Sequence, residues 1–240
     1  FTEVLQQPSA KHLLGTDAIG RDLLSRVLLA GRYSLLVGIT VQIMALAIGL
    51  PLGAIAGWKG GRTDYFIMRL IDVVGSFPML LLQMVLVTIM GILVKPGPWI
   101  VIIALSVTGW LGYCWLIRSQ VLSLREREYV LAAHSFGATS WHIIRKHLIP
   151  NALGPIIVSI SFGIPGTIGA EAGLSFLGLG ITPPTPTWGQ MLGEGGNYIQ
   201  TPSTWYLIIP PAVIMAAVLL SFQFMGDGLR QAMTPGEARK

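Results

Sequence analysis

Residues 125–151 read REREYVLAAHSFGATSWHIIRKHLIPN, a polar stretch that lies between two strongly apolar ones. Gly137 would cost about 1 kcal/mol inside a helix, so we expect it to end a first helix over residues 128–136 in the left-handed conformation. Thr139 or Ser140 can then cap a second helix over residues 141–148. Pro150 is expected to end that second helix, because the residue before a proline avoids the helical region. The stretch therefore predicts a polar helical hairpin.

The composition of the whole chain indicates a membrane protein. Of its 240 residues, 52% are hydrophobic and only 11% are charged, whereas soluble domains carry about 25% charged residues. Because so few charges cannot cover a globular surface, lipid must be the solvent for much of the chain. Pro165, beside Gly163 and Gly166, is expected to break or kink the fourth span. Five stretches reach the length of about 20 apolar residues that a spanning helix needs: residues 33–57, 65–94, 99–121, 152–180 and 205–226.

Basic residues in the loops predict the orientation, because cytoplasmic loops carry an excess of Lys and Arg. The hairpin and the tail after the last span are basic, whereas residues 181–204 contain no Lys or Arg. We therefore expect the hairpin and the C-terminus in the cytoplasm. The basic residues 1–32 then lie outside, which is consistent if a sixth span precedes Phe1. The alternative is a cytoplasmic amphipathic leader and one miscounted span. The net charge of +5 follows this topology and does not indicate nucleic acid.

Patterns of enzyme chemistry and of nucleotide binding are missing from the sequence. No Gly-Lys dipeptide occurs, so the phosphate-binding loop G-x4-G-K-[ST] is absent. No H-E-x-x-H occurs, and residues 173–178 read GLSFLG rather than G-x-S-x-G. The four histidines form no metal-ligand pattern. We expect no catalytic residue, no metal site and no cofactor bound by this chain.

A few residues are candidates for function on their own. Ala133 and Gly137 lie four apart on one helix face, where small residues let another backbone approach; the alternative is packing on the protein's own spans. Glu171 is an ionisable residue inside a span, which makes it a functional candidate. It can line a transport path, pair with a partner's basic group, or bond to backbone freed by Gly169 or Pro165. Gln83 is a second candidate for the path, and packing against another helix is its ordinary role.

The hairpin resembles the cytoplasmic EAA loop of ABC importer permeases. That loop has Glu-Ala-Ala, a Gly four residues on, and a later hydrophobic-Pro pair, matched here by Ala132, Ala133, Gly137 and Ile149-Pro150. Leu131 stands where the family has its Glu, and Glu128 lies three residues earlier. Three more segments resemble the second permease subunit of dipeptide, oligopeptide and nickel importers: HLLGTDAIGRDLLSR (12–26), GLSFLGLGITPPTPTWGQML (173–192) and FMGDGLRQAM (224–233).

This resemblance implies an all-α membrane protein with the type I ABC importer permease fold. It divides the chain into an external leader or amphipathic segment (1–32), a permease domain (33–226) and a cytoplasmic tail (227–240). The domain includes a coupling loop (123–151) and an external loop (181–204). The hairpin is then expected to dock into a separate ATPase, which binds ATP and Mg²⁺. The candidate contacts with the ATPase are Glu128, Tyr129, Val130, Ala132, Ala133, Phe136, Gly137, Ala138 and Pro150.

The same resemblance implies further partners and a function. The partners are a second homologous permease in a heterodimer, two cytoplasmic ATPase subunits, and an extracellular or periplasmic substrate-binding protein, at a prokaryotic inner membrane. Trp188, Gln190 and Glu194 are candidate contacts with the binding protein, with packing on the partner permease as the alternative. The expected function is ATP-driven peptide import. Nickel or metal-chelate import remains an alternative, as does a secondary transporter, for which Glu171 is the only candidate coupling carboxylate.

Overall fold

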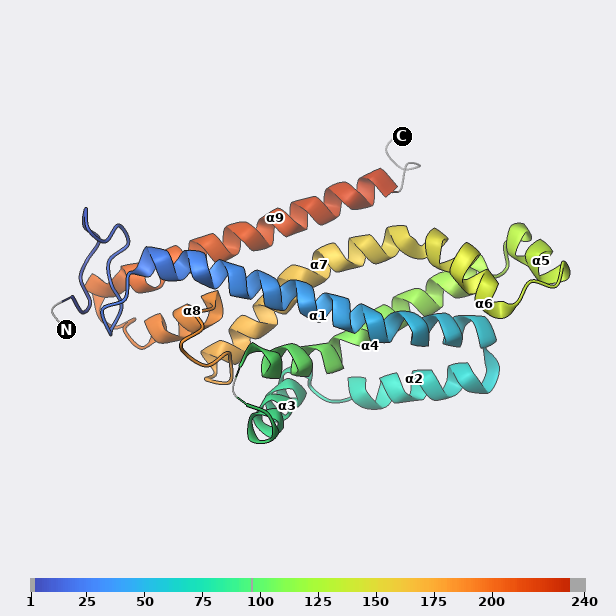
Figure 1. Ribbon diagram of the computed structural model, residues 1–240, viewed down its shortest axis with the longest axis horizontal. Coiled ribbons are helices and arrows are strands. Elements are labelled where there is room, and N and C mark those ends of the chain that lie inside the picture. The colour runs from blue at the N-terminus through green and yellow to red at the C-terminus, as the bar shows by residue number, and fades with distance from the viewer. Residues whose placement is uncertain (1–2, 96, 234–240) are drawn as a thin grey trace.

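The computed structural model describes residues 3–95 and 97–233, which fold into helices without a β-strand (Figure 1). Four helical runs are long and apolar enough to cross a membrane, and α2 with α3 makes a fifth if the bent pair is one span. The predicted all-α membrane fold is therefore confirmed. The elements are α1 (Leu23–Lys59), α2 (Gly61–Gly75), α3 (Met79–Leu93), α4 (Pro98–Leu124), α5 (Glu128–Ser135), α6 (Ser140–Ile143), the π-helical η1 (Ile144–Leu148), α7 (Ile149–Phe176), α8 (Trp188–Gly196), the 3-10 helical η2 (Pro202–Leu207) and α9 (Ile209–Met233).

The contact between α1 and α4 is the most extensive helix pairing in the body. It depends on three glycines spaced four residues apart on α1, Gly49, Gly53 and Gly57. A Cβ at Gly53 would lie 2.6 Å from the carbonyl oxygen of Cys114 in α4, and the other two positions are similarly tight. Because lipid provides no hydrophobic drive between helices, close backbone packing of small residues is what holds such pairs together.

Several helix boundaries differ from the sequence-based expectations. α1 begins at Leu23, ten residues before the expected start at residue 33, because Asp22 caps it through a 2.8 Å bond from the N–H of Ser25. The expected span over residues 65–94 is two helices bent by 86°. The bend falls just before α3, at Pro78, which has no N–H to donate. α9 continues to Met233, and residues 234–240 of the expected tail lie outside the described residues.

Two expectations about prolines differ from the structure. Pro165 does not break the fourth span, since α7 is continuous through it, and only the kink remains a prediction. Pro150 does not end the hairpin's second helix, because the π-turn η1 carries the helix into α7, with the N–H of Ile149 donating to the carbonyl of Ile144. The side-chain amide of Asn151 donates to the carbonyl of His147 at 2.6 Å. That bond satisfies an acceptor in the turn that precedes the proline.

The long helices run along the long axis of the molecule, with shorter elements gathered at each end (Figure 1). The hairpin of α5 and α6 lies at one end. The leader, α8 and the start of α9 lie at the opposite end, together with the N-terminus. A helical body that could span a membrane therefore carries distinct structure at each end.

Candidate functional site

The turn of the hairpin forms as its sequence predicts. Gly137 has φ +81°, the left-handed conformation that glycine adopts without a steric penalty. The N–H of Ala138 then donates to the carbonyl of Ala133 at 3.1 Å, which closes α5. Thr139 caps α6, since its hydroxyl accepts from the N–H of His142 at 3.3 Å. The two helices are thus joined by a short turn whose conformation these residues fix.

One face of the hairpin packs on the helical body. Val130, Ile143 and Leu148 are buried in a hydrophobic cluster that also contains Ile117 and Val121 of α4. Val130, a candidate contact with the ATPase, is only 1% exposed, so its side chain belongs to the protein's own core. The packing attaches the hairpin to α4 as well as to α7, which favours movement of the hairpin together with both spans.

The opposite face of the hairpin presents large apolar side chains to the outside. Phe136 is 91% exposed and Trp141 68% exposed, and Tyr129 and Leu131 are also exposed. Of the other candidate contacts, the exposed ones are Glu128, Ala132, Gly137 and Pro150, and the half-buried ones are Ala133 and Ala138. Sequence reasoning did not select Trp141. The sequence could have indicated Trp141, because it is a large aromatic residue inside an otherwise polar stretch. Exposed apolar groups of this kind mark contact sites.

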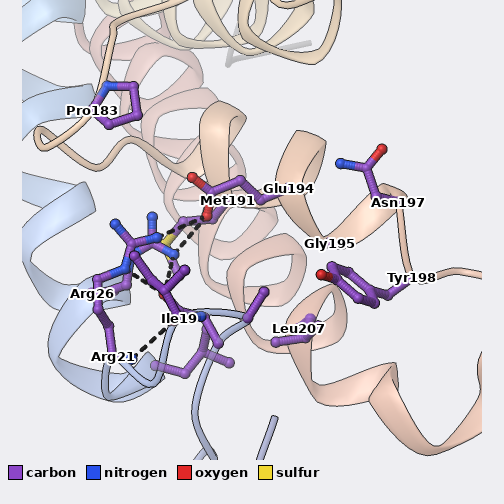
Figure 2. Close-up of a pocket in the computed structure, with 13 residues that line it drawn as sticks. Ile19, Arg21, Arg26, Pro183, Met191, Glu194, Gly195, Asn197, Tyr198 and Leu207 are labelled. Atoms are coloured by element: carbon purple, nitrogen blue, oxygen red, sulfur yellow. Dashed lines mark hydrogen bonds and ion pairs between the residues drawn. The ribbon is translucent and has the colours of Figure 1, made fainter. Parts of the chain in front are cut away.

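At the other end of the molecule, a partly buried charge network ties the leader to α8 (Figure 2). Nη1 of Arg26 donates to Asp17 at 2.8 Å and to Glu194 at 2.7 Å. Nε of Arg21 donates to Asp17 at 2.6 Å, and its Nη2 lies 3.3 Å from Glu194. Burial raises the pKa of the Asp17 carboxyl, but hydrogen bonds from the backbone and side chain of Arg21 and from the N–H of Ile19 outweigh burial. The pKa therefore lies below its ordinary value.

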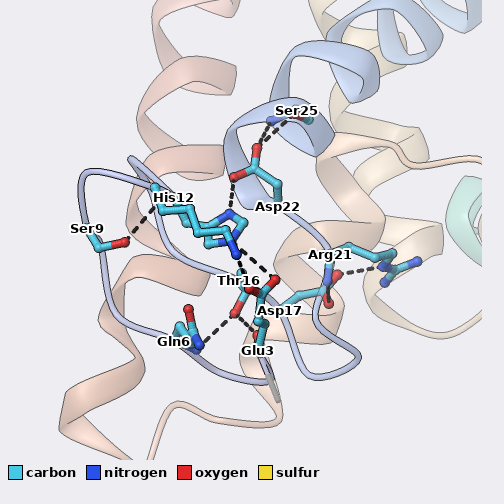
Figure 3. Close-up of polar contacts among 10 residues, drawn as sticks. Glu3, Gln6, Ser9, His12, Thr16, Asp17, Arg21, Asp22 and Ser25 are labelled. Carbon is cyan, nitrogen blue, oxygen red and sulfur yellow. Dashed lines mark hydrogen bonds and ion pairs between the residues drawn. The ribbon is translucent and has the colours of Figure 1, made fainter. Parts of the chain in front are cut away.

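The rest of the leader is an ordered, irregular loop (Figure 3). His12 bonds through Nδ1 to Asp22 at 2.9 Å, and Thr16 accepts from the N–H of Gln6 at 2.9 Å. Lys11 pairs with Glu3. Several positive charges of the leader are thus neutralised within the chain, which removes much of their conflict with an external location.

A cavity of about 340 Å³ adjoins the charge network, between the leader, α8 and η2. Trp188, the first residue of α8, is only 2% exposed. Its Nε1 donates to the carbonyl of Val27 at 3.1 Å, and its backbone N–H donates to Ser34 at 3.2 Å. The structure therefore places Trp188 inside the chain. Gln190 and Glu194 are half-buried and retain some accessible surface.

The two candidates for a transport path lie inside the helical body. Glu171 is fully buried, and its Oε1 accepts from the hydroxyls of Ser175 at 2.7 Å and Thr187 at 2.8 Å. Its partners are therefore side-chain hydroxyls rather than freed backbone, and the bond from Thr187 connects α7 to the start of α8. Gln83 donates from Nε2 to the hydroxyl of Thr108 at 3.0 Å and lines a separate cavity between the spans.

A multi-pass, all-helical membrane body with a helical hairpin at one end is the architecture of a transport permease. The chain belongs to the family of binding-protein-dependent transport system inner membrane components, whose profile matches residues 49–236. It is 43% identical to the dipeptide transport system permease protein DppC of Bacillus subtilis, over 98% of this chain and 72% of that protein. It is also 43% identical to the oligopeptide transport system permease protein OppC of Haemophilus influenzae, over 93% and 70%.

Solved structures share the fold at lower sequence identity. An inward-facing structure of the MetNI methionine ABC transporter aligns with a TM-score of 0.73 and 18% identity, over 88% of this chain and 98% of the matched chain. An amino acid ABC transporter aligns with a TM-score of 0.56 and 18% identity, over 88% and 99%. These likenesses confirm the expected type I ABC importer permease fold.

Proposed function

We propose that this chain is a permease subunit of an ATP-driven importer of peptides. The permeases DppC and OppC, to which it is 43% identical, are named for dipeptide and oligopeptide transport, and this supports a peptide cargo over a nickel chelate or an ion-driven mechanism. In this proposal the chain pairs with a second, homologous permease. Together they form the transport path in the inner membrane of a prokaryote.

The observation that carries the coupling part of the proposal is the exposure of Phe136 on the hairpin. A short helix with exposed apolar side chains is the form that binds in a groove of another protein. The groove would belong to a cytoplasmic ATPase, on which ATP and Mg²⁺ bind and hydrolysis occurs. Because the hairpin packs on α4 and continues into α7, movement of the groove would displace both helices as a rigid body.

The opposite end of the chain is proposed to face an extracellular or periplasmic substrate-binding protein. Gln190 and Glu194 are the proposed contacts, since both keep accessible surface on α8. Trp188 is proposed to act indirectly, by fixing α8 against α1. Glu171 is proposed to influence the path through its bond to Thr187 rather than through contact with cargo.

Cysteine crosslinking in the complete transporter tests the coupling proposal. Cys114 is the only cysteine and is buried, so a single new cysteine is readily distinguished. We expect Phe136→Cys to crosslink to the ATPase with a short bifunctional reagent. Val130→Cys is the matched control in the same helical hairpin, because its buried side chain should give little product. Failure of Phe136→Cys to capture an ATPase in an assembled, active transporter would refute docking through this face.

A further inference from the structure

A cavity of about 200 Å³ lies among α1, α3, α4 and α7, near the middle of the long helices. Gln83 of α3, Thr108 of α4 and Thr167 of α7 supply its polar lining, and Gly163 and Gly166 lie beside Thr167. Every described residue that lines it is uncharged. At Gly166, a Cβ would meet no other atom within 4 Å, so the wall there is open to an approaching chain.

Two glutamines close to this cavity use their amide groups differently. Gln42 is saturated: its Nε2 donates to the carbonyl of Gly163 at 2.9 Å and to Thr167 at 2.5 Å, and its Oε1 accepts from the hydroxyl of Tyr113. Gln83 is 9% exposed but donates only one bond, at 3.0 Å to Thr108. Among the described residues, Oε1 of Gln83 accepts no hydrogen bond and its second N–H has no acceptor.

An unused acceptor and an unused donor on one side-chain amide match the N–H and C=O of a single peptide residue, which point to the same side of an extended chain. A main-chain amide that crosses an apolar region without a partner carries a large free-energy penalty. A lining without charge does not discriminate among the side chains of a peptide, but it can bind the main chain that all peptides share.

We propose that Gln83 binds the main chain of the peptide cargo during its passage, by pairing its free Oε1 and N–H with the N–H and C=O of one residue of the extended cargo. This proposal rests on the proposed function of peptide import and assigns a ligand chemistry to Gln83. Thr108 positions Gln83 by accepting its other N–H, and the open backbone at Gly166 provides space for the extended cargo.

The test uses the complete transporter with its binding protein in proteoliposomes, and compares import of trialanine with import of trialanine N-methylated at both peptide bonds. N-methylation removes the donors that Oε1 of Gln83 would bind. The binding protein's own preference affects every permease variant equally. The informative quantity is therefore the import rate of trialanine divided by that of the N-methylated peptide, compared between the variant and the wild type. We expect this ratio to shrink about fivefold in Gln83→Met, the effect of one lost hydrogen bond of ~1 kcal/mol.

Thr88→Val provides a matched control on the same helix. The hydroxyl of Thr88 is exposed and donates to the carbonyl of Met84 in its own helix at 2.8 Å, so its loss should leave the ratio unchanged. ATP hydrolysis stimulated by the binding protein reports folding and assembly of each variant.

The outcomes separate the two proposals. If Gln83→Met leaves the ratio at its wild-type value while peptide import continues, cargo binding by Gln83 is overturned and the proposed function stands. If the variant slows both cargoes equally, the amide contacts the partner permease instead, which also overturns it. If the wild-type transporter imports neither peptide, the proposed function fails, and the role of Gln83 fails with it.

Discussion

At Gly137 the hairpin turn depends on one backbone conformation rather than on packing. The residue has φ +81°, yet a Cβ there would meet no described residue within 4 Å other than its two chain neighbours. A substitution therefore acts through backbone strain inside this chain, and through steric contact only where another protein approaches closely.

We predict that Gly137→Val weakens association with the ATPase about tenfold, since a β-branched residue in the left-handed region costs roughly 1–2 kcal/mol. Gly137→Asn should bind nearly as well as the wild type, because asparagine tolerates that region. Co-purification of the ATPase in detergent measures both. Equal losses in the two variants would contradict a conformational cause and would indicate close packing of the ATPase on Gly137 itself.

The charge network at Asp17 predicts a dependence on pH. The folded chain holds the pKa of Asp17 below its ordinary value of about 4. A carboxyl with a depressed pKa stabilises the fold at pH values above the ordinary value, and this contribution is lost as the pH falls through the folded pKa. We expect the protection of residues 15–27 against hydrogen exchange, measured relative to the unfolded chain at the same pH, to fall below about pH 4.

In Asp17→Asn the same amides should exchange faster already at neutral pH, and this acid-dependent step should be smaller. Glu3→Gln serves as the control, because Glu3 pairs with Lys11 and takes no part in the ion pairs of Arg21 and Arg26. An unchanged acid step in Asp17→Asn would show that another group controls it.

At the scale of elements, α1 and α4 pack so closely that an added side-chain atom would clash at their interface. A Cβ at Gly53 would collide with backbone, which cannot shift as a flexible side chain can. We predict that Gly53→Val lowers the unfolding temperature in detergent by several degrees, since overpacking costs about 1–3 kcal/mol. Gly112→Val in α4 is the matched control, because nothing lies within 4 Å of its Cβ. Equal stability of both variants would mean that α1 and α4 can move apart to accommodate the larger side chain.

The sequence predicted some elements better than others, for physical reasons. Length and hydropathy were enough to find the four helical runs that could cross a membrane, but not the bend between α2 and α3. Local chemistry was enough for the turn at Gly137 and the cap at Thr139. The expected break at Pro150 was wrong because a π-turn accommodates the proline, and nothing in the local pattern indicates such a turn. The repeat of Gly49, Gly53 and Gly57 was a readable signal of close helix packing that the sequence reasoning did not use.

Among the candidate site residues, those whose environment depends on local sequence were predictable, and those whose environment depends on distant contacts were not. Exposure of Phe136 follows from its place in a polar hairpin, whereas burial of Trp188 depends on contacts with Val27 and Ser34, more than 150 residues away in the chain. The pairing of Arg26 with Glu194 joins residues 168 positions apart. No periodicity within one segment reports such contacts, so the neutralisation of the leader's charge could not be predicted.

At the scale of the whole molecule, α7 connects the two ends. The run from Ser140 to Phe176 is continuous, starting in the hairpin and ending close to α8, to which Glu171 and Thr187 bond it. Under the proposed function, displacement of the hairpin reaches the opposite end through this helix.

We predict that two glycines inserted after Ile160 uncouple the transporter. ATP hydrolysis should remain, because the hairpin is intact, while peptide import in proteoliposomes should fall at least tenfold, since a flexible break cannot transmit displacement. The same insertion after Gln200, in an exposed turn, is the control and should preserve import. Normal import with the break in α7 would mean that α4 alone transmits the motion.

The π-turn at η1 sets the direction in which the hairpin faces. Successive residues of an α-helix are rotated by about 100° around its axis, and this turn holds one residue more than an α-helical turn would. If a single residue were deleted there, the hairpin would swing by roughly that angle relative to α7. Phe136 and Trp141 would then point away from their present side, with every residue of the hairpin unchanged. The direction of the hairpin's exposed apolar face is thus set by the number of residues in one turn, independently of the residues that make up that face.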